Sequence, residues 1–451
     1  MNLVYGIKDK PKFPQLLIFA FQQVLAILAA TILVPVIINN NADVLAKFPE
    51  GAGMSQSAAL LGAGIGTLVY QLFTKFKSPV YLGSSFAFLG SMGAAFAGAM
   101  SISAGYAGII IGAILAGLVY VVIAIVVKLV GVNWIEKLMP AAVIGPTVAI
   151  IGMSLAGNAV ADLGTVRVTG GSPYVSLIIG LITLFSIMVF SVYGKKMMKL
   201  IPFVLGILVG YVVAVIFTLI GNATDNAALM AIDFSAFKDM EIFAVPDFSF
   251  IMAMEGVKKI DGAYIATVAV AYIPVAFVVF AEHIADHKNL SSIIGQDLLK
   301  EPGLHRTLLG DGVGSMAGAF FGGCPNTTYG ESVGCVAITR NASVITITAA
   351  AIMCIIISFF GPFVTFLASI PNCVMGGVCF ALYGFIAVSG LKMVQKVDLN
   401  QSKNLFTVSV ILIAGIGGLS VSFGKVTLTS IACALILGII ANLLLNKAKD
   451  E

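Results

Sequence analysis

The sequence is poor in charge and in the residues that build metal or catalytic centres. Only 10% of its 451 residues are charged, and it has three histidines, six cysteines and one tryptophan. Because soluble domains average about 25% charged residues, this composition excludes an ordinary soluble protein. The cysteines show neither metal-type spacing nor a secreted disulfide pattern, so we expect small buried thiols. We expect a protein that is not an enzyme and that has no cofactor, no metal site and no nucleic-acid partner.

Hydrophobic residues are abundant instead, at 59% of the chain, and the mean hydropathy is +1.05. Apolar runs of about 18 residues or more recur from end to end, and such a run crosses roughly 30 Å of hydrocarbon as a helix. In lipid each backbone polar group needs a partner within the protein, which favours helices over loops or open sheets. The sequence therefore predicts an all-α polytopic membrane protein.

The predicted membrane segments number fourteen. They are residues 15–39, 55–74, 80–98, 104–127, 139–157, 174–193, 200–220, 263–285, 307–322, 326–339, 343–366, 371–391, 404–420 and 426–445. With the amino terminus inside, the inner loops and ends hold 19 Lys and Arg residues and the outer loops hold 6, as the positive-inside rule requires. We therefore expect a multi-pass protein of the cell membrane with both termini in the cytoplasm and an external loop at 226–262.

Two pairs of similar peptides indicate an internal repeat. LLGAGIGT at 60–67 resembles LLGDGVGS at 308–315, and SPVYLGSSF at 78–86 aligns with CPNTTYGES at 324–332. The octamers fall in segments 2 and 9, so each repeat holds seven segments and the second copy is inverted, as in many secondary transporters. Segments 3 and 10 each begin at a proline and contain a glycine. Interrupted segments at matching positions of two halves indicate a binding site near the membrane midplane.

Four acidic residues are expected at membrane depth, where an ionisable side chain is costly and therefore a functional candidate. They are Glu282, Asp286, Asp311 and Glu331. Glu282 and Asp286 lie four residues apart on one helix face, and two close carboxylates in a low dielectric resist double ionisation. We expect Glu282, Asp286 and Asp311 to serve proton coupling. Asp286 also fits a solvated residue at a cytoplasmic helix end, and Asp311 also fits a local helix cap.

The histidines beside these acids are expected to do other things. His283 turns about 100° away from Glu282 on a helix, so we expect it to pack or to form hydrogen bonds. His287 and Lys288 are expected at the cytoplasmic surface.

Two buried carboxylates and the backbone N–H groups of broken helices suit a particular kind of ligand. They disfavour anions and they complement a small, neutral, planar solute with N–H donors beside carbonyl acceptors. A nucleobase fits this description better than a sugar or a metal ion.

At these residues the chain resembles the nucleobase–ascorbate transporter family (nucleobase cation symporter 2), and its bacterial uracil permeases most. The resemblance runs along the whole chain and is strongest in YLGSSFAF, FAEH, DLLKEPGLHR and PNTTYGESVGCVAITR. It implies that Glu282 and Glu331 accept hydrogen bonds from the base, while the N–H groups of Gly330 and Phe86 donate to it. The residues expected to support that site are Ser85, Tyr329, Ser332 and His283.

The resemblance also implies an architecture and a mechanism. It places a core domain at 1–132 and 263–367 (segments 1–4 and 8–11) and a gate domain at 133–225 and 368–451 (segments 5–7 and 12–14). Short strands are expected in segments 3 and 10. Members of the family couple transport to protons and can form homodimers. We therefore expect proton-coupled uptake of uracil across the lipid bilayer by alternating access.

Two departures from the family pattern keep alternatives open. Ser332 stands where the family signature has asparagine, and Asp286 stands where uracil permeases often carry histidine. Asp286 together with Asp311 is more like the xanthine-type members, so a xanthine or uric acid permease of the same family is the main alternative. Two intramembrane glutamates disfavour an anion carrier of the related sulfate-transporter fold, and the broken helices disfavour a channel.

Overall fold

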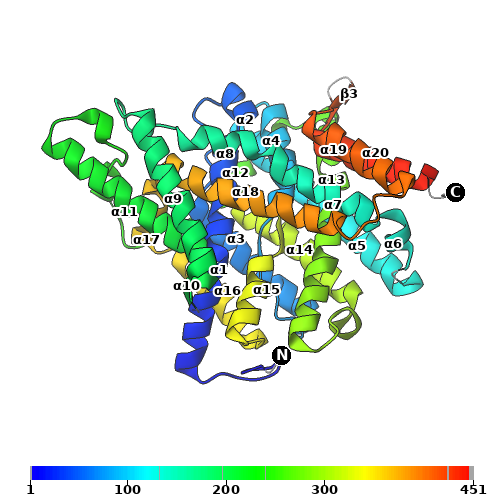
Figure 1. The fold of residues 1–451 in the computed structure, drawn as a ribbon. Coiled ribbons are helices and arrows are strands. Elements are labelled where there is room, and N and C mark those ends of the chain that lie inside the picture. The colour runs from blue at the N-terminus through cyan, green and yellow to red at the C-terminus, as the bar shows by residue number, and fades with distance from the viewer. Residues whose placement is uncertain (1–2, 132, 196, 239, 424–425, 446–451) are drawn as a thin grey trace.

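The computed structural model describes residues 3–131, 133–195, 197–238, 240–423 and 426–445, and most of them are helical (Figure 1). The first half contains α1 (Phe13–Asn39), α2 (Ala42–Lys47), α3 (Gln56–Phe73), α4 (Leu89–Gly98), α5 (Ile102–Val130), α6 (Asn133–Leu138), α7 (Ala141–Ser154), α8 (Ala156–Leu163), α9 (Pro173–Tyr193), α10 (Met197–Leu200) and α11 (Pro202–Ala223). The second half contains α12 (Ser249–Ala253), α13 (Gly262–Ile294), α14 (Leu304–Gly322), α15 (Gly330–Thr339), α16 (Val344–Ser358), α17 (Gly361–Ser369), α18 (Asn372–Val394), α19 (Ser402–Ile416) and α20 (Ser430–Leu445).

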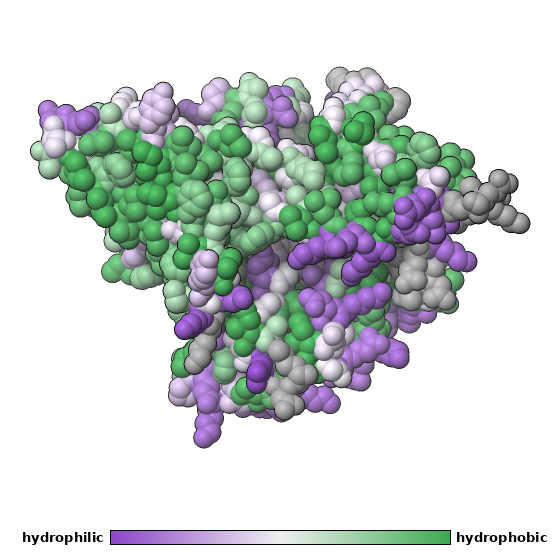
Figure 2. All heavy atoms as spheres, viewed as in Figure 1, coloured by the Kyte–Doolittle hydropathy of each residue, from purple (hydrophilic) through white to green (hydrophobic). Residues whose placement is uncertain are grey.

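The chain is a multi-pass helical membrane protein. Each predicted membrane segment contains at least one helix, and seven stretches of the described chain are long and apolar enough to cross a membrane. These seven stretches comprise α1–α2, α5, α7–α8, α9, α11, α13 and α18. Figure 2 shows hydrophobic side chains covering the face formed by α9 and α11, where Phe185, Val189 and Val192 are exposed. Such a surface suits lipid. The count of fourteen spans and their inverted repeat stay predictions.

Element boundaries differ from the predicted ones at several places, including the following three. α13 continues to Ile294 instead of ending at 285, because Leu290 packs in a buried cluster and the helix stops only at Gly295, which has a left-handed backbone (φ 71°). The predicted segment 343–366 divides into α16 and α17, where the Gly361 N–H bonds to the Ile242 carbonyl (2.9 Å) in the 226–262 loop. Strands β3 (Val421–Phe423) and β4 (Val426–Leu428) form a hairpin before α20, at residues where an apolar membrane segment was expected to begin.

The two interrupted segments meet each other as a pair of strands. β1 (Leu82–Ser84) pairs antiparallel with β2 (Asn326–Thr328), with Leu82 opposite Thr328 and Ser84 opposite Asn326. This pairing confirms the short strands expected in segments 3 and 10, and it satisfies backbone groups that lie outside any helix. Gly83 is required because a Cβ there would overlap the ring of Tyr329. Helical structure resumes on the far side of each strand, at η1 (Phe86–Phe88) and at α15.

Small residues bring α3 and α14 into close contact. A Cβ on Gly62 would lie 2.6 Å from the Gly318 carbonyl oxygen, and a Cβ on Gly66 would lie 2.8 Å from that of Gly314. Backbones approach this closely only where both helices carry small residues. Asn326 of β2 anchors the strands to this interface, because its Nδ2 donates to the Gly62 carbonyl (2.9 Å).

The helices pack in two sets. α3 and α5 both pack on α14, and α13 and α16 join them. In the other set α7, α8 and α9 pack on α18, α19 packs on both α7 and α20, and α11 packs on α9. The polar side chains described next lie where α13 and the strand pair face the second set.

A candidate substrate-binding cavity

A cavity of about 470 Å³ lies where the two interrupted segments face the second helix set. One wall carries polar groups from η1, α13, β2 and α15: Phe86, Glu282, Asp286, Thr328, Gly330 and Glu331. The opposite wall is largely apolar and comes from α7, α11 and α18: Ile144, Val148, Phe203, Leu382 and Phe385. A concave apolar site with a few convergent polar groups is the usual form of a small-molecule site.

α13 brings two carboxylates to this cavity, one helical turn apart. The side chain of Glu282 is exposed to the cavity, and it has no ion pair or hydrogen bond to another residue that the structure describes. Asp286 is half-buried, and its Oδ2 accepts a hydrogen bond from Thr328 Oγ1 (2.7 Å). A Cβ on Gly330 would lie 3.9 Å from Asp286 Oδ1, so this carboxylate lies close to the start of α15. Asp286 is therefore a cavity residue and not a solvated helix end.

Two helix amino termini also reach the cavity. η1 begins at Phe86 and α15 begins at Gly330, with Glu331 in the first turn of α15. The first N–H groups of a helix lack partners within it, and the positive end of the helix dipole lies there. The cavity wall therefore offers hydrogen-bond donors from the backbone beside acceptors from Glu282 and Glu331.

Three of the expected supporting residues hold the interrupted segments in place. The buried Ser332 Oγ accepts hydrogen bonds from Gln23 Nε2 and from the Tyr81 N–H (3.3 Å). Tyr329 donates from its hydroxyl to the Ser84 carbonyl (2.8 Å), and the Ser85 N–H bonds to the Pro325 carbonyl (2.9 Å). Ser332 thus has a partner on α1 that suits a short side chain, which accounts physically for a residue shorter than asparagine.

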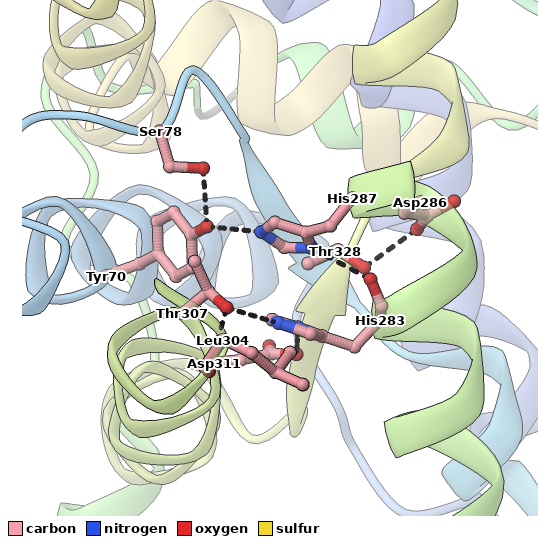
Figure 3. A network of polar contacts seen from close by, with 9 residues as sticks. All are labelled: Tyr70, Ser78, His283, Asp286, His287, Leu304, Thr307, Asp311 and Thr328. Carbon is pink, nitrogen blue, oxygen red and sulfur yellow. Dashed lines mark hydrogen bonds and ion pairs between the residues drawn. The ribbon is translucent and has the colours of Figure 1, made fainter. Parts of the chain in front are cut away.

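Asp311 and His283 lie apart from the cavity wall. Both are buried (1% and 0% exposed), and His283 Nδ1 lies 2.7 Å from Asp311 Oδ2 (Figure 3). His283 Nε2 contacts Thr307 Oγ1 at 2.9 Å. The expectation of a hydrogen-bonding His283 is met, and Asp311 makes this side-chain contact from the middle of α14 instead of capping the helix start.

His287 was expected at the cytoplasmic surface, and this expectation is wrong. Its ring is fully buried, its Nε2 lies 2.7 Å from the Tyr70 hydroxyl, and its Nδ1 bonds to the His283 carbonyl (2.8 Å). The longer α13 is the physical reason, because it carries this turn of helix inward against α3. Lys288, on the adjacent position, is exposed as expected.

Four residues of these networks were not predicted from the sequence: Thr328, Thr307, Tyr70 and Gln23. They are uncharged and common in membrane helices, and their partners are hundreds of residues away or on another helix. The alignment of the two interrupted segments was the one available signal, since Thr328 occupies the place of Leu82 there.

A second cavity of about 850 Å³ adjoins the first and shares Ile144, Ala281, Ala285, Ser389 and Met393 with it. Its lining includes Lys288, Lys392 and Lys396. From the charge bias of the sequence, we expect these three lysines on the inner side. The polar wall therefore communicates with the lysine-bearing side of the molecule.

A family model described as Permease family matches residues 14–423 of the chain. A uracil permease from Bacillus caldolyticus is 38% identical over 98% of this chain and 94% of its own length, and one from Bacillus subtilis (strain 168) is 36% identical over 99% and 96%. Among solved structures, the murine Solute Carrier 26 family member A9 anion transporter in the inward-facing state aligns with a TM-score of 0.66 at 13% identity, covering 97% of this chain and 69% of that one. This last likeness concerns the fold alone.

Proposed function

The chain belongs to this Permease family, and on that premise we propose that it takes up uracil by proton-coupled alternating access. It is a transporter and not an enzyme. The two uracil permeases named above share more than a third of its residues along nearly their whole length, which supports a pyrimidine base as the substrate.

The observation that carries the proposal is the polar wall of the cavity. Uracil has two N–H donors and two carbonyl acceptors around one planar ring. In our proposal the carboxylates of Glu282 and Glu331 accept from the N–H groups, while the N–H groups of Gly330 and Phe86 donate to the carbonyls. Hydrogen bonds in which the acceptor is ionised are among the stronger ones. The ring itself would pack between Phe86 and the apolar wall from α7 and α18.

The proposed architecture is a core and a gate domain built from inverted repeats. The two helix sets support the domains, because the core elements 1–132 and 263–367 pack mainly among themselves. The repeat is supported by contacts between equivalent positions: Gly66 meets Gly314, and Leu82 pairs with Thr328, each being the counterpart of the other in the aligned peptides. Such self-matching contacts are what a twofold axis between two copies produces.

Proton coupling, orientation and assembly complete the proposal. Asp286 and Glu282 on α13, with Asp311 behind them, are the proposed coupling residues. Both termini would lie in the cytoplasm, which places the lysine-lined second cavity inside the cell and describes an inward-facing state. We also propose that two chains form a homodimer in the membrane.

A purine base of the xanthine or uric acid type is the second candidate. One observation favours it: Asp286, where uracil permeases often have histidine, lines the cavity beside Gly330. Three carboxylates on one wall disfavour an anion, whatever the likeness of fold to an anion transporter.

Labelled uracil uptake by proteoliposomes tests the proposal. We expect uphill accumulation that needs an inwardly directed proton gradient, that stops when a protonophore is added, and that thymine competes with better than xanthine or hypoxanthine. Stronger competition by xanthine than by uracil itself would give the purine assignment. Accumulation driven by a sodium gradient alone would refute proton coupling.

A further inference from the structure

The buried pair His283–Asp311 is separate from the substrate wall, although it shares α13 with Glu282. Figure 3 shows the pair between α13 and α14, with Thr307 on one side and His287 and Tyr70 beyond it. All of these side chains are buried, so each polar hydrogen must be accounted for within the protein.

Thr307 links its own hydrogen bonds to the protonation of the pair. When its hydroxyl donates its one hydrogen to the Leu304 carbonyl (3.0 Å), its oxygen accepts from His283 Nε2 (2.9 Å). In this arrangement Nε2 carries a hydrogen. The short contact between Nδ1 and Asp311 Oδ2 (2.7 Å) then needs a second hydrogen, on either the ring or the carboxyl. Either way the pair holds one proton more than a carboxylate beside a neutral imidazole, and its net charge is zero.

The other oxygen of Asp311 agrees with this account. Among the described residues Oδ1 has no hydrogen-bond partner, and it adjoins a void of about 10 Å³ that Tyr120 and Asn326 also line. A void of that size has room for about one water molecule. An ionised carboxylate with so few partners is costly to bury, so a carboxyl that shares a proton with His283 is the less costly form.

The neighbouring histidine confines the proton to this pair. The rings of His283 and His287 stack with centroids 4.0 Å apart, and two cationic rings at that distance repel each other. His287 Nδ1 must donate to the His283 carbonyl, and a neutral His287 then accepts from the Tyr70 hydroxyl at Nε2. The Tyr70 oxygen accepts in turn from Ser78 (2.7 Å). The titratable groups that interact with the pair from the surrounding elements are Tyr70, Tyr120, Glu282, Asp286 and His287.

We propose that, among the coupling residues named above, Asp311 together with His283 holds the exchangeable proton, and that Thr307 is the positioning residue which sets the proton affinity of this pair. This inference rests on the proposed proton-coupled uptake. In the loaded state Thr307 accepts from Nε2–H and donates to the Leu304 carbonyl. On release one proton passes to water, the remaining hydrogen stays on Nδ1 against an ionised Oδ2, and the Thr307 hydroxyl turns to donate to the bare Nε2. The net charge of the pair changes from zero to minus one.

Thr307 makes one hydrogen bond more in the loaded state than after release, so it favours the proton. Thr307→Val keeps the shape and removes the hydroxyl. We expect the pH midpoint above which uracil uptake declines to move down by about one pH unit, since one hydrogen bond corresponds to about that shift. Thr307→Ser restores a hydroxyl and the original midpoint.

The measurement is the pH profile of uracil uptake by proteoliposomes that contain the full chain. Thr348→Val is the matched control, because the Thr348 hydroxyl donates to the Val344 carbonyl (3.0 Å) and the residue lies on another helix, α16, which packs on α3 and α1. We expect its midpoint to equal that of the wild type. Where Thr307→Val does not purify as a folded protein, Thr307→Ala removes the same hydroxyl and should give the same downward shift.

An unchanged or raised midpoint in the Thr307→Val or Thr307→Ala protein would overturn the inference and leave the proposed uptake standing. A wild-type protein that takes up no uracil at any pH would overturn the proposed function, and this inference would fall with it. The two failures are therefore distinguishable in one data set.

Discussion

Glu282 and His283 are neighbours in sequence and lie in opposite environments. Glu282 faces the cavity with no protein partner among the described residues, whereas His283 is enclosed and bonded at both ring nitrogens. Successive residues on an α-helix point about 100° apart, so one turn of α13 presents an open acceptor to substrate and a satisfied polar group to the protein interior. An unpartnered carboxylate can gain a hydrogen bond from a ligand, whereas a histidine bonded at both ring nitrogens has no free group to offer to a ligand.

The largest effect is expected at Glu282, which faces the cavity. Glu282→Gln replaces an acceptor by an amide whose NH₂ group faces the substrate's N–H, so we expect uracil affinity to fall about 10- to 100-fold, the effect of losing one charge-assisted hydrogen bond. Uphill accumulation should be lost as well. Binding of uracil to the purified protein by calorimetry measures the first effect. Glu255→Gln, in the exposed 226–262 loop, is the control and should bind as the wild type does. Wild-type affinity in Glu282→Gln would remove Glu282 from the substrate wall.

A smaller effect is expected at Thr328, which lines the cavity and donates a hydrogen bond to Asp286. Thr328→Val removes the hydrogen bond to Asp286 Oδ2 and leaves this carboxylate in the cavity without that donor. We expect uracil affinity to change by about 3- to 10-fold, as for one ordinary hydrogen bond, with the pH midpoint of uptake unaltered. A midpoint that moves as far as that of Thr307→Val would show that the cavity carboxylates, and not the buried pair, hold the proton.

The residues of the cavity wall could be predicted from the sequence, whereas the buried hydrogen-bond partners could not. Acidic residues within apolar runs are conspicuous, and the glycine and proline breaks located the strands that place Gly330 and Phe86, so the cavity wall could be predicted from local pattern. Ser332 with Gln23 and Asp286 with Thr328 join different elements of the chain, and hydropathy carries no signal for such pairs.

The prediction for His287 was wrong for a different reason. Its polarity and the adjacent lysine were typical of a helix leaving the membrane, but tertiary packing of Leu290 and the contact with Tyr70 extend α13 and enclose the ring. The breaks at α16–α17 and at β3–β4 likewise depend on contacts that hydropathy does not report, as between Gly361 and Ile242.

The smallest effect is expected at the exposed ion pair of Lys77 and Glu301, which contrasts with the buried pair of His283 and Asp311. Lys77 Nζ lies 2.7 Å from Glu301 Oε1, and the two side chains are 39% and 60% exposed. The hydrogen bond and charge of Lys77 lower the pKa of Glu301 from its ordinary value. A carboxylate with a lowered pKa in the folded state contributes stability above its unfolded pKa, and that contribution is lost as the pH falls through the folded pKa.

We therefore expect Glu301→Gln to lower the Tm at pH 7 by about 1 °C or less, because exposed ion pairs are weak and screened by salt. The difference from the wild type should vanish at a pH below the lowered pKa and shrink in high salt, whereas the effect of Thr307→Val on the uptake midpoint should resist salt because that site is buried. Thermal unfolding of both proteins across pH and ionic strength measures this, and a difference that persists in acid would show that Glu301 acts through packing and not through its charge.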